Sequence, residues 1–236
     1  MTDSLNSVQQ FSLFAELSPA DRASIVSAAH EKSFSRKEII YSEGNPVKQV
    51  IMLLSGCVKV TQRALNGNEV ILRLTGPGEL LGGLGKATSE HFSSAQTLQK
   101  STALVWETKQ FEDLLARLPI LRRNIAHALE RHLNELEQRF REVSTEKVGS
   151  RLSSELLRLS NRHGRPGSGR SEITLSRAEL AQLTGLSLFT VSRLLCQWES
   201  LGIVKIRREA VTGKKEHSTS RWYETILRWL RRFRWW

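Results

Sequence analysis

Short apolar runs separated by turn residues characterise the chain between residues 37 and 107. The runs are rich in Val, Ile, Leu and Thr, and a glycine stands at a turn position about every eleven residues. The pair Asn66–Gly67 is typical of a tight β-hairpin. Short strands at this regular spacing predict a small antiparallel β-roll or barrel. The runs assigned to strands are 38–42, 49–55, 57–63, 69–75 and 102–107.

The pattern changes to a helical period near Pro119. Apolar residues then recur at alternating spacings of four and three, the heptad spacing of a helix that pairs with another helix. We predict one long helix over residues 118–147, whose apolar seam pairs with that of a second copy of the chain. Packing of the seam on the chain's own β-roll is the alternative. Shorter helices are predicted over residues 18–30 and 147–161. The seam consists of Leu129, Leu133, Leu136, Phe140 and Val143.

Two short helices joined by a tight turn are predicted around Gly185. Ser176 stands three residues before Glu179, the spacing of a capping box, and Gly185 suits the left-handed position that ends a helix. Ser187 is placed to cap the second helix, which carries one apolar stripe at positions i, i+3, i+4 and i+7. This arrangement predicts a helix-turn-helix. The stripe consists of Val191, Leu194, Leu195 and Trp198.

The other face of the second helix has the chemistry of a DNA major-groove reader. Arg193 can pair with guanine through two hydrogen bonds, and Phe189 and Ser192 stand beside it. Two strand-like segments, 203–206 and 210–212, enclose a basic turn and predict a wing. Hydroxyl and guanidinium groups around this helix suit phosphate contacts. The predicted DNA-binding residues are Ser176, Arg177, Ser187, Phe189, Thr190, Ser192, Arg193, Arg207 and Arg208.

Charge separates the two halves of the chain. The formal net charge is +11, yet residues 1–147 hold 18 Lys and Arg against 17 Asp and Glu. Residues 148–236 hold 17 against 7. The second half is therefore expected to meet a polyanion, either nucleic acid or an anionic membrane surface, and a solvated basic face without a partner stays open.

The last residues, 216–236, form a basic, Trp-rich tail. Its aromatic and apolar residues are spaced four and three apart, with arginines between them, so an amphipathic helix is expected. Such a helix suits a membrane surface, a partner's groove or the chain's own DNA-binding domain. A further interpretation is that this tail has replaced the segment that would naturally continue the wing. The apolar series is Trp222, Ile226, Trp229, Phe233 and Trp236.

Taken together, these segments resemble the Crp–Fnr family of bacterial transcription regulators over about residues 11–212. The resemblance is carried by the β-roll, by GPGELLGGLG at 76–85, by the long helix and by TVSRLL at 190–195. It implies an α+β fold and a homodimer on a palindromic operator in double-stranded DNA, with RNA polymerase and a small-molecule effector as further partners. The expected parts are a cyclic-nucleotide-binding-like sensor β-roll (1–117), a dimerisation helix (118–147), a winged helix-turn-helix (148–215) and the tail (216–236).

Departures from the family pattern narrow the expected effector. Relatives that bind cyclic AMP carry a Glu and an Arg at positions that align with Gly82–Gly83 and Ser93–Ser94 of this chain. These four residues are the predicted effector pocket, and without the Arg a buried phosphate lacks its paired cation. We therefore expect no cyclic AMP binding of the usual kind. The N-terminal cysteine cluster of the iron–sulfur branch is also missing, because residues 1–56 contain no Cys.

No residues indicate catalysis or a metal site. Two cysteines and six scattered histidines offer no ligand pair, so no cofactor is predicted, and haem remains a possibility without support. The expected function is that of a cytoplasmic DNA-binding regulator, not an enzyme, controlled by a small-molecule effector or a redox signal at the β-roll. The alternative is a ligand-binding roll whose basic tail binds a membrane surface.

Overall fold

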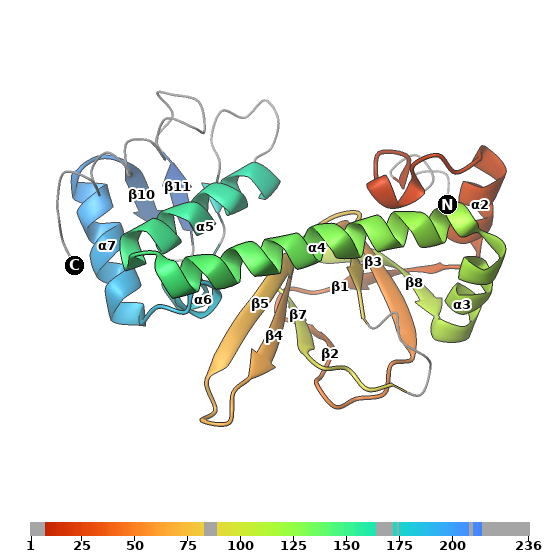
Figure 1. Ribbon diagram of the computed structural model, residues 1–236, viewed down its shortest axis with the longest axis horizontal. Helices are drawn as coiled ribbons and strands as arrows, with labels where there is room; N and C mark the ends of the chain where they lie inside the picture. The colour runs from red at the N-terminus through yellow and green to blue at the C-terminus, as the bar shows by residue number, and fades with distance from the viewer. Residues whose placement is uncertain (1–7, 83–88, 164–171, 174, 208–209, 214–236) are drawn as a thin grey trace. The chain divides into compact units, whose positions relative to one another are not determined.

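The computed structural model describes residues 8–82, 89–163, 172–173, 175–207 and 210–213 (Figure 1). The chain divides into two compact units, Met1–Leu136 and Glu137–Trp236. The division falls within the long helix α4 (Pro119–Thr145). The domain limits expected from the sequence remain predictions.

Unit 1 contains two four-stranded antiparallel sheets, ordered β1-β8-β3-β6 and β2-β7-β4-β5. The predicted β-roll is thus confirmed, and β3 and β5 match their predicted ranges. Strands β1, β6 and β7 were not predicted. The strands are β1 (His30–Phe34), β2 (Ile39–Tyr41), β3 (Gln49–Ser55), β4 (Val58–Arg63), β5 (Glu69–Thr75), β6 (Leu80–Leu81), β7 (Ser94–Thr97) and β8 (Ser101–Glu107).

Two apolar clusters stabilise unit 1. One joins residues of both sheets, including Leu53, Val60 and Val105, and so lies within the roll. The other joins the sheet to η1 (Ser12–Phe14), α2 (Pro19–Ser27), α3 (Thr108–Arg117) and the start of α4. At its centre the buried Trp106 donates its indole N–H to the carbonyl of Ile25 at 2.8 Å.

The predicted helix over 18–30 was partly wrong. Ser18 caps α2 as expected, but the helix ends at Ser27, and His30 already begins β1. Helix α3 was not predicted. No element was predicted between the last expected strand, which ends at residue 107, and the long helix expected from residue 118.

The long helix α4 forms over nearly its predicted range. One face of its first turns is buried in unit 1, where the amide of Asn124 donates to the carbonyls of Leu13 and Ala15 at 3.0 and 2.8 Å. Its five seam residues are uncovered by the described part of the chain. Their exposed fractions are Leu129 53%, Leu133 55%, Leu136 39%, Phe140 76% and Val143 54%.

In the described part of unit 2, helices α5, α6 and α7 follow the end of α4 and accompany a small sheet ordered β10-β11-β9. The helix-turn-helix and the wing hairpin are confirmed, because α6 and α7 follow each other and β10 pairs antiparallel with β11. Strand β9 was not predicted. The elements are α5 (Val148–His163), β9 (Glu172–Ile173), α6 (Arg177–Thr184), α7 (Leu188–Ser200), β10 (Val204–Arg207) and β11 (Ala210–Gly213).

The α+β fold expected from the sequence is confirmed: a β-roll, a long helix and a helix-turn-helix follow in this order. None of the described helices combines the length and apolarity needed to cross a bilayer. The tail at 216–236 lies outside the described residues.

Candidate nucleic-acid interface

The turn between α6 and α7 is held by the caps that the sequence predicts. The hydroxyl of Ser176 accepts from the N–H of Glu179 at 3.2 Å, and the Glu179 carboxylate accepts from the N–H of Ser176 at 2.7 Å. Gly185 ends α6 in the left-handed region at φ 66°. A side chain at this position would strain the backbone, so glycine sets where α7 begins.

Helix α7 begins with a second cap. The Ser187 hydroxyl accepts from the N–H of Thr190 at 3.1 Å and lies 2.9 Å from the Thr190 hydroxyl. Both hydroxyls therefore lie at the first turn of the helix, where they were predicted as phosphate contacts.

One face of α7 is packed into unit 2. Val191, Leu195 and Trp198 are fully buried, and Leu194 is 6% exposed. At the other end of the helix, the Glu199 carboxylate accepts from the N–H of Ile206 at 2.8 Å and joins α7 to strand β10. The buried stripe fixes the rotation of the helix about its axis, which determines the residues that face outward.

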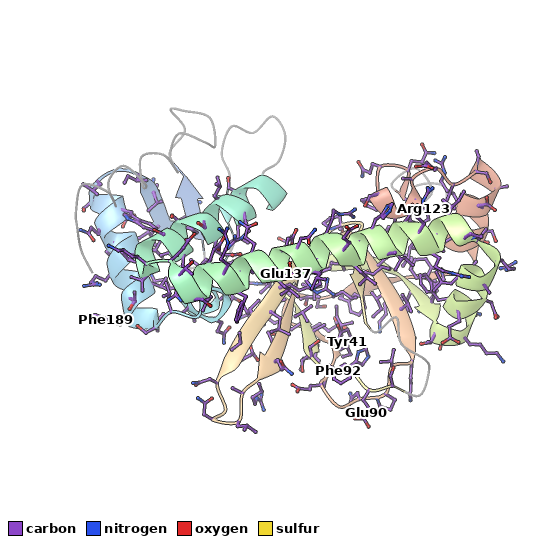
Figure 2. The ribbon with its side chains drawn as sticks, viewed as in Figure 1. Tyr41, Glu90, Phe92, Arg123, Glu137 and Phe189 are labelled. Carbon is purple, nitrogen blue, oxygen red and sulfur yellow. The ribbon has the colours of Figure 1, made fainter. Side chains whose placement is uncertain are left out.

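The outward face carries the predicted reading residues. Phe189 is 76% exposed, Arg193 and Cys196 are exposed, and Ser192 is half-buried. Figure 2 labels Phe189 at the start of α7. Arg193 is exposed, and its side chain makes no hydrogen bond or ion pair with the described part of the chain.

The remaining residues predicted to contact DNA lie before and after α7 in the sequence. Arg177 is half-buried at the start of α6, and Arg207 is exposed at the end of β10. Arg208 lies outside the described residues. Sequence reasoning missed Leu188, which is 53% exposed directly after the cap of α7. Its position one residue before Phe189 was the available signal.

A buried ion network joins the last turns of α4 to α5 within unit 2. Arg158 pairs with Glu142 and with Glu155 at 2.7 Å each, and Arg139 pairs with Glu155 at 2.9 Å. Both carboxylates are buried. Burial alone would raise the pKa of Glu142, but the hydrogen bonds and positive charge of Arg158, with help from Gln138 and Arg139, hold it below its ordinary value.

In unit 1, two of the four predicted pocket residues meet at the hydroxyl of Tyr41. The N–H of Gly82 donates to this oxygen at 3.3 Å, and Ser93 hydrogen-bonds to it through its side chain. Burial raises the pKa of Tyr41, although these two groups and the charge of Arg73 oppose the rise. The phenol therefore remains protonated at neutral pH.

The ring of Tyr41 is stacked on His91, with centroids 3.8 Å apart and planes 9° from parallel. Burial lowers the pKa of His91, so the imidazole is neutral at pH 7. The predicted pocket residue Ser94 lies apart from this group and accepts from the N–H of Glu43 at 3.0 Å, while Gly83 is outside the described residues. Sequence reasoning missed Tyr41 and His91, because contacts between β2 and the segment before β7 follow only from the fold.

The backbone at Gly82 is closely surrounded. Its φ is 88°, and a Cβ at this position would lie 2.9 Å from the carbonyl oxygen of Gln49. Glycine is thus required both by conformation and by space. Among the described residues, no group of three or more His, Cys, Asp or Glu side chains is placed to hold a metal ion.

Comparison with protein families identifies both units. The cyclic nucleotide-binding domain family matches residues 31–118, and the Crp-like helix-turn-helix domain family matches residues 150–215. These ranges include the roll with Tyr41 and Gly82, and the helix pair with Arg193.

Individual proteins of known sequence or structure are similar over most of the chain. The CRP-like cAMP-activated global transcriptional regulator of Mycobacterium tuberculosis is 26% identical over 202 residues, 84% of this chain and 90% of that protein. The transcriptional regulatory protein btr of Bordetella pertussis is 29% identical over 181 residues, 75% of this chain and 74% of that protein. The structure of FixK2 from Bradyrhizobium japonicum has the same fold, with a TM-score of 0.71 at 22% identity over 83% of this chain and 96% of that one.

Proposed function

The chain belongs to the Crp–Fnr family of transcription regulators, and from that premise we propose that it binds a palindromic operator as a homodimer, using α7 as the reading helix. Regulators of this family bind DNA and are not enzymes. The observation that carries the proposal is the division of α7 into a fully packed stripe and an outward face on which Arg193 has no described partner.

Arg193 supplies the direct base contact in this proposal. Its planar guanidinium matches the two acceptors that guanine presents in the major groove. The groups around it suit the phosphates on either side, which position the helix without reading sequence. The proposed phosphate contacts are Ser176, Arg177, Ser187, Thr190, Arg207 and Arg208, with Ser192 beside Arg193 on the reading face.

The second copy of the chain meets the first through the exposed seam of α4. Five apolar side chains in heptad register, none of them buried, favour this pairing over a solvated surface. A twofold dimer presents two reading helices to half-sites about 34 Å apart, one turn of DNA.

Control is proposed to come from the β-roll, in the cytoplasm, through a small molecule other than cyclic AMP or through a redox signal. Two observations support an effector other than cyclic AMP. Residue 93 is Ser and carries no positive charge, and the Tyr41 hydroxyl already accepts the hydrogen bond of the Gly82 N–H. The bound regulator would then act on RNA polymerase.

Selection of DNA from a random pool by the purified protein tests the proposal. We expect a palindromic consensus containing a guanine in each half-site. The Arg193→Ala variant is expected to lose about 1–3 kcal/mol per contact and to tolerate any base at that one position. Equal weakening on all sequences, with no consensus for the parent protein, would refute α7 as a sequence reader.

A further inference from the structure

Two large apolar side chains stand exposed at the very start of the reading helix. Leu188 is 53% exposed and Phe189 is 76% exposed, and they are the first two residues of α7 after the Ser187 cap. The packed stripe of this helix begins only at Val191. The helix is therefore capped and anchored without any contribution from these two side chains.

Their position relative to Arg193 determines what they can touch. Phe189 and Arg193 are four residues apart, so they share one face of α7 with about 6 Å of helix between them. Leu188 precedes Phe189 by one residue and points about 100° away around the helix axis. The two side chains thus form an apolar edge at the N-terminal end of the surface that carries Arg193.

The charge around this apolar edge indicates which kind of ligand contacts it. The half of the chain from residue 148 holds 17 basic residues against 7 acidic ones, which favours DNA over an apolar protein surface. Leu and Phe side chains cannot exchange hydrogen bonds with base edges. The apolar feature that the major groove offers them is the 5-methyl group of thymine.

We propose that Leu188 and Phe189 read thymine 5-methyl groups in the operator, within about two base pairs of the guanine that Arg193 contacts. This rests on the proposed function and adds to it the chemistry of the neighbouring base. Because the two side chains diverge, each reads a different thymine. The surface disfavours cytosine at these positions, since cytosine lacks the 5-methyl group that the apolar side chains would contact.

Replacement of thymine by deoxyuridine tests the proposal at the level of one methyl group. Each thymine within two base pairs of the guanine in the selected operator is replaced, in both half-sites together, and the Kd is measured by fluorescence anisotropy at one fixed salt concentration. Uracil keeps every hydrogen bond of thymine and lacks only the methyl. Loss of one apolar contact in each half-site is expected to raise the Kd about tenfold.

Protein variants connect the methyl effect to the two side chains. The Phe189→Ala protein is expected to bind the thymine and uracil operators equally when the replaced thymine is the one that Phe189 contacts. The Leu188→Ala protein is expected to do the same when the replaced thymine is the one that Leu188 contacts. Leu65→Ala, a change at an exposed leucine between β4 and β5, serves as the control and should keep the tenfold difference. Unchanged thermal unfolding of all three variants shows that α7 stays folded.

The outcomes separate this inference from the function it rests on. A consensus with a guanine but no effect of uracil, or a uracil effect that survives in both Leu188→Ala and Phe189→Ala, overturns the methyl reading alone. Absence of any consensus overturns the proposed function, and the methyl reading with it.

Discussion

Tyr41 hydrogen-bonds to two of the four residues that the sequence assigns to effector binding, Gly82 and Ser93. Its hydroxyl accepts from Gly82 and is hydrogen-bonded to Ser93, and its ring lies on His91. A cyclic phosphate placed here would have to displace this hydroxyl, and residue 93 offers it no cation. Among the described residues, the Tyr41 hydroxyl thus satisfies the polar groups of Gly82 and Ser93, and the charge of Arg73 acts on the same oxygen.

Cyclic AMP is therefore expected to bind this protein no more tightly than about 1 mM, because Ser93 cannot supply the Arg side chain that pairs with the cyclic phosphate in relatives that bind cyclic AMP. Isothermal titration calorimetry of the purified chain measures this. A variant that carries both Gly83→Glu and Ser93→Arg supplies the two missing groups and should bind more tightly than its parent. Saturable binding by the parent at micromolar concentrations would contradict the expectation.

Glu142 is expected to stabilise unit 2 through Arg158. In Glu142→Gln the guanidinium keeps only Glu155, and we expect a loss of roughly 1–3 kcal/mol, less than for an isolated buried pair. Thermal unfolding at pH 7 measures the loss. Glu137→Gln, an exposed change on the same helix (Figure 2), is the control and should leave stability unchanged.

The same variant has a defined pH dependence. The pKa of Glu142 is lowered in the folded chain, so its contribution is complete above the unfolded pKa of about 4.3 and is lost as the pH falls through the folded value. The difference between Glu142→Gln and its parent should shrink below about pH 4. A difference that stays constant down to pH 3 would show that the charge of Glu142 does not act in this way.

Residues that act locally were predictable, and residues that act across the fold were not. The caps at Ser176 and Ser187 and the turn at Gly185 each depend on neighbours within four positions, so spacing alone revealed them. The pair between Glu142 and Arg158 spans 16 positions and depends on how α5 follows α4. Nothing in either segment alone indicates that contact.

Among the elements, burial explains which strands could be predicted from the apolar pattern of the sequence. Strands β3 and β5 have mostly apolar runs and were predicted to the residue. Strand β1 has four exposed residues of five, and β6 has only two residues, so neither leaves an apolar run. Strand β9 is equally short, and among the described residues its partner is β11 of the wing.

The seam of α4 makes the clearest prediction for an element. Leu133→Asp places a charge on each side of the proposed dimer contact and removes the two leucines that this contact would bury, so the dissociation constant of the dimer should rise at least about 100-fold. Sedimentation equilibrium measures it. Leu65→Asp alters an exposed leucine between β4 and β5 and is the matched control. A Leu133→Asp protein that remains dimeric would place the interface elsewhere.

At the scale of the whole molecule, charge and fold agree. The near-neutral half contains the roll that matches cyclic nucleotide-binding domains, and the strongly basic half contains the helix-turn-helix. The order of these parts and the family followed from the sequence, because each part carries its own local signals. The hydrogen bond between Tyr41 and Gly82 in the roll could not be predicted from the sequence, since the two residues lie 41 positions apart.

In the proposed function, the two reading helices of one dimer bind two half-sites together. The most direct measurement compares the affinity for the selected palindrome with the affinity for the same DNA carrying about five extra base pairs, half a turn, between the half-sites. We predict a loss of at least about 100-fold, because the second half-site is rotated to the far side of the DNA. Equal affinity for both DNAs would show that each α7 binds alone, and would contradict the account.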